Sequence, residues 1–115
     1  MLEVVFHRDS RQRLSSIFAA GHAEFADHGE DIVCAAVSAI LQAARLGLES
    51  YAGVRLEAHQ APGEFRIELP KKVRDDEAVR AIVATAELSV EQIAKQFPTH
   101  VIVRKTNKKS RGDAT

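Results

Sequence analysis

Apolar and polar positions divide the first part of the chain into two strands, a loop and a helix. The strand-like run Leu2–His7 ends in the polar stretch RDSRQR, and Leu14–Ala20 then returns, which predicts a β-hairpin closed by Gly21. The next stretch has no apolar periodicity and predicts a mobile acidic loop. It contains Glu24, Asp27, Gly29, Glu30 and Asp31.

Asp31 is a good N-cap residue for the apolar run that follows. That run predicts a central helix reaching Leu46, with Gly47 as its stop. Because the run is apolar on nearly every side, we expect the helix to be largely buried.

The second part of the chain has the pattern of another hairpin, a helix and a last strand. Val54–His59 and Glu64–Leu69 alternate apolar and polar residues around the turn APG, which predicts two strands. From Asp75 onward, apolar residues recur at three and four positions until Pro98, as in an amphipathic helix. Val101–Val103 is a final short strand. The order ββαββαβ predicts an α+β fold with two helices packed on one largely antiparallel sheet.

Composition indicates one globular domain and no global charge. With 115 residues, we expect a single domain over residues 1–104 and a basic, disordered tail over 105–115. Sixteen acidic and sixteen basic residues cancel, so nothing favours direct nucleic-acid binding through overall charge. The start of the chain does not resemble a secretory signal, and the apolar stretch from Ile32 to Leu48 is short for a bilayer span. We therefore expect a cytoplasmic protein that makes no membrane contact.

The only cysteine, Cys34, is the residue that suggests chemistry. If Asp31 caps the helix, the thiol lies in the first turn, where unpaired backbone N–H groups favour a thiolate and donate to an oxyanion. His22 stands at the end of the preceding strand and is a candidate general base. The pattern thus allows a Cys/His dyad, although cysteine is also commonly a small buried hydrophobic residue.

A metal site is the other chemistry that this stretch suggests. His22, His28 and Cys34 are evenly spaced, but structural zinc takes four ligands and catalytic zinc three well-oriented ones. We expect neither a metal nor a cofactor.

The same stretch resembles a known family, the ribosomal-processing cysteine proteases called Prp. The resemblance is carried by Gly21-His22-Ala23, by Gly29, and by the block DIVCAAVSA from Asp31 to Ala39. It implies a small cytoplasmic α+β homodimer. It also implies a cysteine endopeptidase that removes the N-terminal extension of a bacterial large-subunit ribosomal protein, the twenty-seventh in the standard naming, by cleaving after an aromatic residue. That step matures the ribosome.

The resemblance assigns roles by position. Cys34 is the nucleophile and His22 the base, while Gly21, Asp31 and Ser38 support them. We further hypothesise that the acidic loop binds the basic N-terminus of the substrate, with Phe25 near its aromatic side chain. The residues of this substrate loop are Glu24, Phe25, Asp27, Gly29 and Glu30.

Two non-proteolytic interpretations stay open. In the first, the chain is a non-catalytic ribosome- or RNA-associated module whose basic tail binds phosphates. The residues of that tail are Arg104, Lys105, Lys108, Lys109 and Arg111. In the second, the chain is a thiol redox sensor if Cys34 oxidises readily, although no resolving cysteine is present.

Overall fold

The computed structural model describes residues 1–21 and 28–108, with residues 28–31 described by their backbone. In these ranges the chain forms five strands, two long helices and two short helical segments. The strands are β1 (Leu2–Arg8), β2 (Leu14–Ala20), β3 (Glu57–Ala61), β4 (Glu64–Glu68) and β5 (Val101–Asn107). The helices are α1 (His28–Leu46), the π-helical turn η1 (Gly47–Tyr51), the 3₁₀ turn η2 (Lys71–Val73) and α2 (Glu77–Gln96).

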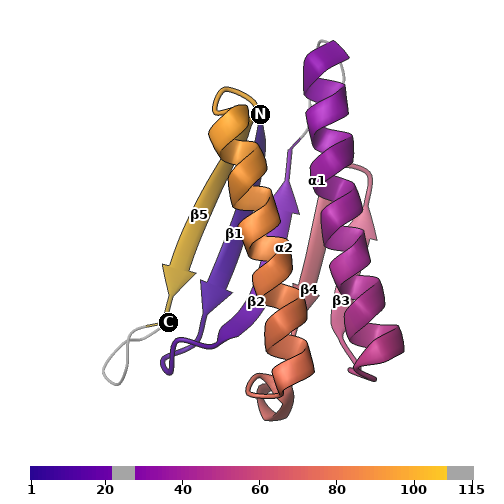
Figure 1. The fold of residues 1–115 in the computed structure, drawn as a ribbon, viewed down its shortest axis with the longest axis vertical. Coiled ribbons are helices and arrows are strands. Elements are labelled where there is room, and N and C mark those ends of the chain that lie inside the picture. Colours follow the sequence, from indigo (N-terminus) through magenta and orange to yellow (C-terminus); the bar gives the residue numbers. More distant parts are fainter. Residues whose placement is uncertain (22–27, 109–115) are drawn as a thin grey trace.

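The strands form one sheet in the order β3-β4-β2-β1-β5. All neighbours are antiparallel except β1 and β5, which run parallel. Helices α1 and α2 lie side by side on the same face of the sheet (Figure 1). The predicted α+β class and the element order ββαββαβ are confirmed.

The core lies between this sheet face and the two helices. Strand β1 buries Leu2, Val4 and Phe6 and turns the residues between them to the other face, the alternation expected of a sheet covered on one side. Helix α1 adds Val37 and Leu41 to the same core, and each fully buried side chain of this size stabilises the fold by about 1.5–3 kcal/mol.

The predicted start of the first helix was wrong. Helix α1 begins at His28, so Asp31 is its fourth residue and cannot be its N-cap. Gly29 and Glu30, which were assigned to the acidic loop, also lie in this first turn. Acidic residues in a first turn are favoured by the helix dipole, so Glu30 and Asp31 suit this position without capping it.

Helix α1 ends at Leu46, as predicted, but the chain does not leave the helical path at Gly47 and continues there as η1. A Cβ at Gly47 would lie 3.4 Å from Cδ1 of Ile82 on α2, an ordinary van der Waals distance. Because the helical run continues, Ile32–Tyr51 is long and apolar enough to cross a membrane by length and composition alone, contrary to the expectation of a short stretch. The same composition suits a core helix, and Val37 and Leu41 pack into the core.

Two strand boundaries differ from the predictions. Strand β3 begins at Glu57, because Val54 is buried and its N–H donates to the carbonyl of Leu48, closing η1. Strand β5 extends to Asn107, where it pairs with Arg8 at the end of β1. Residues 105–107 thus belong to the sheet and not to a tail. Residues 109–115 lie outside the described part of the chain.

Candidate active site

A cavity of about 270 Å³ opens beside Cys34. Its walls come from the first half of α1, the ends of β1 and β2, and the tip of the β3–β4 hairpin. The lining residues are Leu2, Ala19, Gly21, Cys34, Ala35, Val37, Ser38, Leu41, Gln60, Ala61, Gly63, Glu64 and Phe65. We call this space the Cys34 cavity. Its walls are about equally polar and apolar, and polar side chains come from Ser38, Gln60 and Glu64.

Cys34 is half-buried on α1, between the core residues Val33 and Val37. The helical repeat places Cys34, Ser38 and Leu41 on the same side, and all three line the cavity. Because α1 begins at His28, Cys34 lies in the second turn and not in the first turn as predicted. The unpaired amides that were expected around the thiol belong to residues one turn earlier.

Ser38 stands one turn after Cys34, as predicted, and is exposed at the cavity. Its Oγ accepts a hydrogen bond of 2.8 Å from Nε2 of Gln42. A hydroxyl can donate while it accepts, so Ser38 retains donor capacity beside the cavity.

Gly21 lines the cavity and immediately precedes His22. Its φ of +101° is rarely adopted by residues with a side chain, and a Cβ there would lie 2.5 Å from the carbonyl oxygen of Met1. Its N–H donates to the carbonyl of Gly63 at 3.0 Å. The end of β2 is thereby fixed against both the chain start and the hairpin tip.

The remaining predicted site residues cannot all be placed. His22, Glu24, Phe25 and Asp27 lie outside the described residues, so the dyad distance and most of the substrate loop remain predictions, as does the zinc alternative that includes His22. The backbone of Asp31 lies one turn before Cys34.

Sequence reasoning did not predict that residues of the β3–β4 hairpin line the cavity. Gln60, Gly63, Glu64 and Phe65 reach the cavity through pairing of β4 with β2, a contact that only the tertiary fold creates. The turn APG predicted the hairpin but not its position beside Cys34.

The basic residues proposed for RNA binding are partly engaged elsewhere. Arg104 pairs with Glu3 on β1, and Nζ of Lys105 lies 2.6 Å from Oε2 of Glu91 on α2. Lys109 and Arg111 lie outside the described residues. These ion pairs give Arg104 and Lys105 a role within the domain, which weakens the RNA interpretation.

An α+β layer with a half-buried cysteine on a helix, beside a cavity large enough for a side chain of a peptide, has the parts that a small cysteine peptidase requires. The sequence model of one family, described as cysteine protease Prp, matches residues 1–102. The chain therefore belongs to the Prp family of cysteine proteases.

Individual relatives agree with this assignment. A ribosomal processing cysteine protease Prp of Bacillus subtilis (strain 168) is 27% identical over 107 residues, which cover 90% of this chain and 96% of the relative. A crystal structure from Streptococcus mutans is 29% identical with a TM-score of 0.80, covering 93% of this chain and 98% of that one. The essential ribosomal processing protease Prp from Staphylococcus aureus, crystallised with a substrate peptide, has a TM-score of 0.82 at 20% identity, covering 91% and 99%. These likenesses confirm the fold.

Proposed function

We propose that this protease removes the N-terminal extension of a large-subunit ribosomal protein, the twenty-seventh in the standard naming, by cleaving after an aromatic residue. The observation that carries the proposal is the family match over residues 1–102 together with the opening of Cys34 into a cavity. The relatives named as ribosomal processing proteases support the substrate class. Such an activity belongs in the cytoplasm, where ribosomes mature.

In the proposed mechanism, His22 takes the thiol proton of Cys34 and the thiolate attacks the scissile carbonyl. The tetrahedral intermediate collapses when the C–N bond breaks and His22 gives its proton to the leaving amine. Water activated by His22 then attacks the thioester and releases the new carboxylate. Gly21 supports this assignment, because it lines the Cys34 cavity and is directly followed by His22.

The Cys34 cavity is suited to the side chain that precedes the cleaved bond. Leu2, Val37, Leu41 and Phe65 give it an apolar lining, and its volume of about 270 Å³ is sufficient for an aromatic ring. Ser38 lies on the same wall, and we assign it a positioning role through the hydroxyl proton that Gln42 leaves available.

The acidic residues of the substrate loop, which continues into the first turn of α1, are proposed to attract the basic substrate. Glu24, Asp27 and Glu30 raise the local concentration of a cationic N-terminus, an effect that salt screens. Phe25 then contacts the substrate's aromatic side chain. Neutralising the three acids is expected to raise KM at low salt and to leave KM little changed at high salt.

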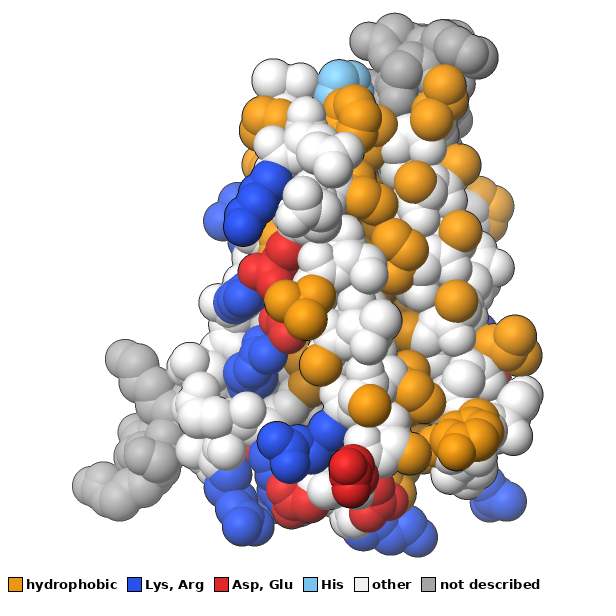
Figure 2. All heavy atoms as spheres, viewed as in Figure 1, with side chains coloured by type: hydrophobic (Ala, Val, Ile, Leu, Met, Phe, Trp, Pro, Cys, Tyr) orange, Lys and Arg blue, Asp and Glu red, His pale blue; other side chains and the backbone are white. Residues whose placement is uncertain are grey.

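A homodimer is proposed from the outer face of the helices. Ile32 on α1 and Leu88 on α2 are each more than half exposed. Between these helices runs an apolar groove that includes Ile40, Ala44 and Ile82. Figure 2 shows hydrophobic side chains along this face, with Lys and Arg side chains toward its edge and lower end. Light scattering after gel filtration measures the mass directly, and Leu88→Glu should yield monomers.

The decisive experiment is incubation with a synthetic peptide copying the N-terminus of the host's ribosomal protein, followed by mass spectrometry. We expect cleavage after an aromatic residue, and loss of cleavage in Cys34→Ala and in His22→Ala. Circular dichroism checks that both variants fold. A folded wild type that leaves the peptide intact would contradict the proposed substrate, and full activity of His22→Ala would remove the dyad.

The same proteins separate the redox alternative. A sensor changes mass at Cys34 under mild peroxide and cleaves no peptide. Cleavage that requires Cys34 assigns the thiol to peptidase chemistry instead.

A further inference from the structure

Strand β3 forms an open edge of the sheet next to the Cys34 cavity. It is the outermost strand beside β4, and all five of its residues are exposed. Open edges carry unpaired N–H and C=O groups that can pair with another extended chain. The question is which backbone groups of β3 point outward.

Hydrogen bonds between the neighbouring strands β2 and β4 answer this. The N–H of Leu69 donates to the carbonyl of Ser15 at 2.8 Å, and Gly21 donates to Gly63 at 3.0 Å. Odd-numbered positions along β4 therefore bond toward β2. Because backbone groups alternate in direction along a strand, the even-numbered residues of β4 bond toward β3.

The register then identifies the outward groups of β3. The even-numbered residues of β4 face Glu57, His59 and Ala61. The residues between them, Ala58 and Gln60, consequently direct their N–H and C=O groups to the open edge. No backbone hydrogen bond to either residue is present in the described part of the chain outside the strand ladder.

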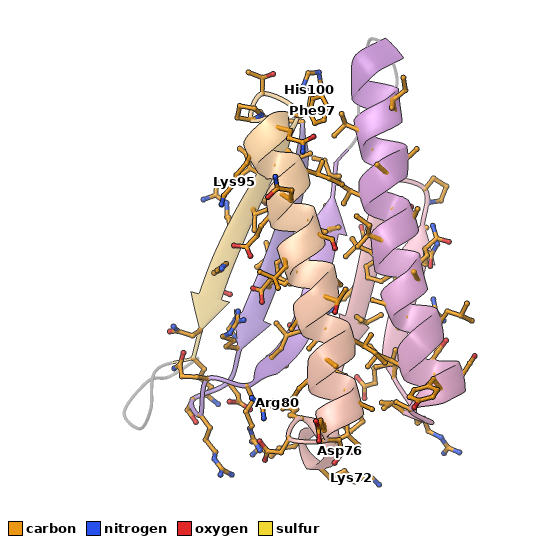
Figure 3. The ribbon with its side chains drawn as sticks, viewed as in Figure 1. Lys72, Asp76, Arg80, Lys95, Phe97 and His100 are labelled. Atoms are coloured by element: carbon orange, nitrogen blue, oxygen red, sulfur yellow. The ribbon has the colours of Figure 1, made fainter. Side chains whose placement is uncertain are left out.

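A shallow groove of about 500 Å³ lies on the helix side and reaches this edge at Gln60. The α1 residues Ala39, Ala43 and Leu46 form its apolar wall, and Gln60 forms part of its strand wall. The Nη1 of Arg45 donates to Oε1 of Gln60 at 3.3 Å, so α1 engages the glutamine side chain and not its backbone. Figure 3 shows α1 lying alongside the hairpin of β3 and β4.

The groove and the Cys34 cavity are neighbours, because Gln60 lines both. From Cys34 to Arg45 the rise along α1 is about 16 Å, which about five residues of an extended peptide span. The distance from the Cys34 thiol along α1 thus corresponds to a peptide of about five residues, the length that several substrate subsites of a protease would occupy.

We propose that an extended segment of the substrate polypeptide adds to β3 as a sixth strand, pairing with the backbone of Ala58 and Gln60. Its alternate side chains pack on the α1 wall of Ala39, Ala43 and Leu46. Gln60 is the positioning residue where this strand enters the Cys34 cavity. The proposal rests on the proposed proteolytic function and adds the way in which the substrate is held.

Proline at position 60 tests the pairing, because it removes an outward N–H without removing a bond to β4. We expect Gln60→Pro to lower kcat/KM for the ribosomal-protein peptide by about tenfold, mainly through KM, as for the loss of a substrate hydrogen bond. The matched control, Gln60→Ala, removes the same side chain but keeps the N–H, so it should retain more kcat/KM than Gln60→Pro, and equal losses in the two variants would contradict the backbone pairing. A folded Gln60→Pro variant that cleaves at the wild-type rate would overturn the proposal.

A second readout does not depend on catalysis. Hydrogen exchange of the Cys34→Ala protein, resolved for single amides by NMR, should show fast exchange at Ala58 and Gln60 that the peptide slows. No slowing at saturating peptide overturns the proposal. Slow exchange without peptide also overturns it, since a second copy or another segment would then cover the edge.

The two readouts distinguish failure of this inference from failure of the proposed function. A wild type that cuts nothing contradicts the substrate, while amide protection by the same peptide would still support the open edge. If Gln60→Pro does not fold, peptides N-methylated at successive amides replace it. Unchanged cleavage of every N-methylated peptide would overturn the pairing.

Discussion

Asp9 and Arg74 form a buried ion pair across 65 residues of sequence, with Oδ2 and Nη1 3.1 Å apart and each side chain only 10% exposed. The other carboxylate oxygen of Asp9 accepts hydrogen bonds from the N–H groups of Arg11 and Arg13. Arg74 also donates to the carbonyl of Leu69. The pair therefore fastens the turn between β1 and β2 to the segment that leads into α2.

The ion pair predicts a specific loss of stability in acid. Burial alone raises the pKa of Asp9, but the hydrogen bonds from Arg13, Arg74 and Arg11 outweigh it and lower the pKa from 3.8 to about 2. At pH values above its pKa in the unfolded chain, this carboxylate thus adds about 2 kcal/mol to the free energy of unfolding. That contribution is lost as the pH falls from about 4 to about 2. Urea unfolding of Asp9→Asn should show that deficit at pH 7 and a shrinking deficit below pH 4.

Asp75→Asn is the matched control for Asp9→Asn. Its carboxylate lies 2.8 Å from Nη1 of Arg13 but is 66% exposed, so its removal should change the free energy of unfolding by less than about 1 kcal/mol. Equal losses in the two variants would contradict the assignment of stability to the buried carboxylate.

Gly21→Ala should damage both the fold and the activity. The new methyl would meet the Met1 carbonyl at 2.5 Å in a backbone conformation that alanine avoids, which we expect to cost about 3 kcal/mol. The strand end before His22 would shift, so kcat/KM should fall even below the melting temperature. Thermal unfolding and peptide cleavage measure the two effects.

Gly53→Ala is the comparison for Gly21→Ala. Its φ of +68° is also left-handed, but nothing lies within 4 Å of the added Cβ, so only about 1 kcal/mol of backbone strain is expected. Cleavage by this variant should equal that of wild type. Similar destabilisation at both glycines would show that the Met1 contact does not matter.

Arg8 and Glu87 join β1 to α2 through two hydrogen bonds, of 3.0 and 2.6 Å. The Glu87 side chain is 10% exposed, so Arg8→Ala leaves a nearly buried carboxylate without its partner and should destabilise the fold by about 3 kcal/mol. Adding Glu87→Met to Arg8→Ala should recover part of this loss. A double-mutant cycle from chemical denaturation measures the coupling, and additive single effects would contradict it.

Ser38→Ala tests the positioning role of the hydroxyl. Gln42 donates to its oxygen. If the hydroxyl donates to the reacting groups, its removal should lower kcat by about tenfold with little change in KM. Gln42→Ala keeps the hydroxyl and should have a smaller effect. An unchanged kcat in Ser38→Ala would leave the residue as a packing element.

Local patterns predicted the elements well where one face is buried. The alternation in Leu2–Arg8 and the repeat in α2 are set by the same core, so each was visible in sequence. Strand β5 was underestimated because its residues after Val103 are exposed, and only pairing with β1 keeps them extended. Gly47 suggested a stop, and the α-helix does end before it, but the chain continues as the π-helical turn η1.

The site was predicted in part for the same reason. Cys34 and Ser38 share a helical face that spacing alone defines, and both line the cavity. The opposite wall comes from the β3–β4 hairpin, whose place beside α1 depends on strand order. No spacing within one segment contains that information.

The parallel pairing of β1 with β5 sets when the centre of the sheet can be completed during synthesis. His7 and Thr106, which share a side-chain hydrogen bond across these strands, are separated by 99 residues, so β1 waits for its second partner until nearly all of the described chain has been made. Until then the central part of the sheet presents an open edge, and Leu2 at the Cys34 cavity lacks its neighbour Val101. A nascent chain thus contains Cys34 long before the strand that completes the surroundings of its cavity has been made.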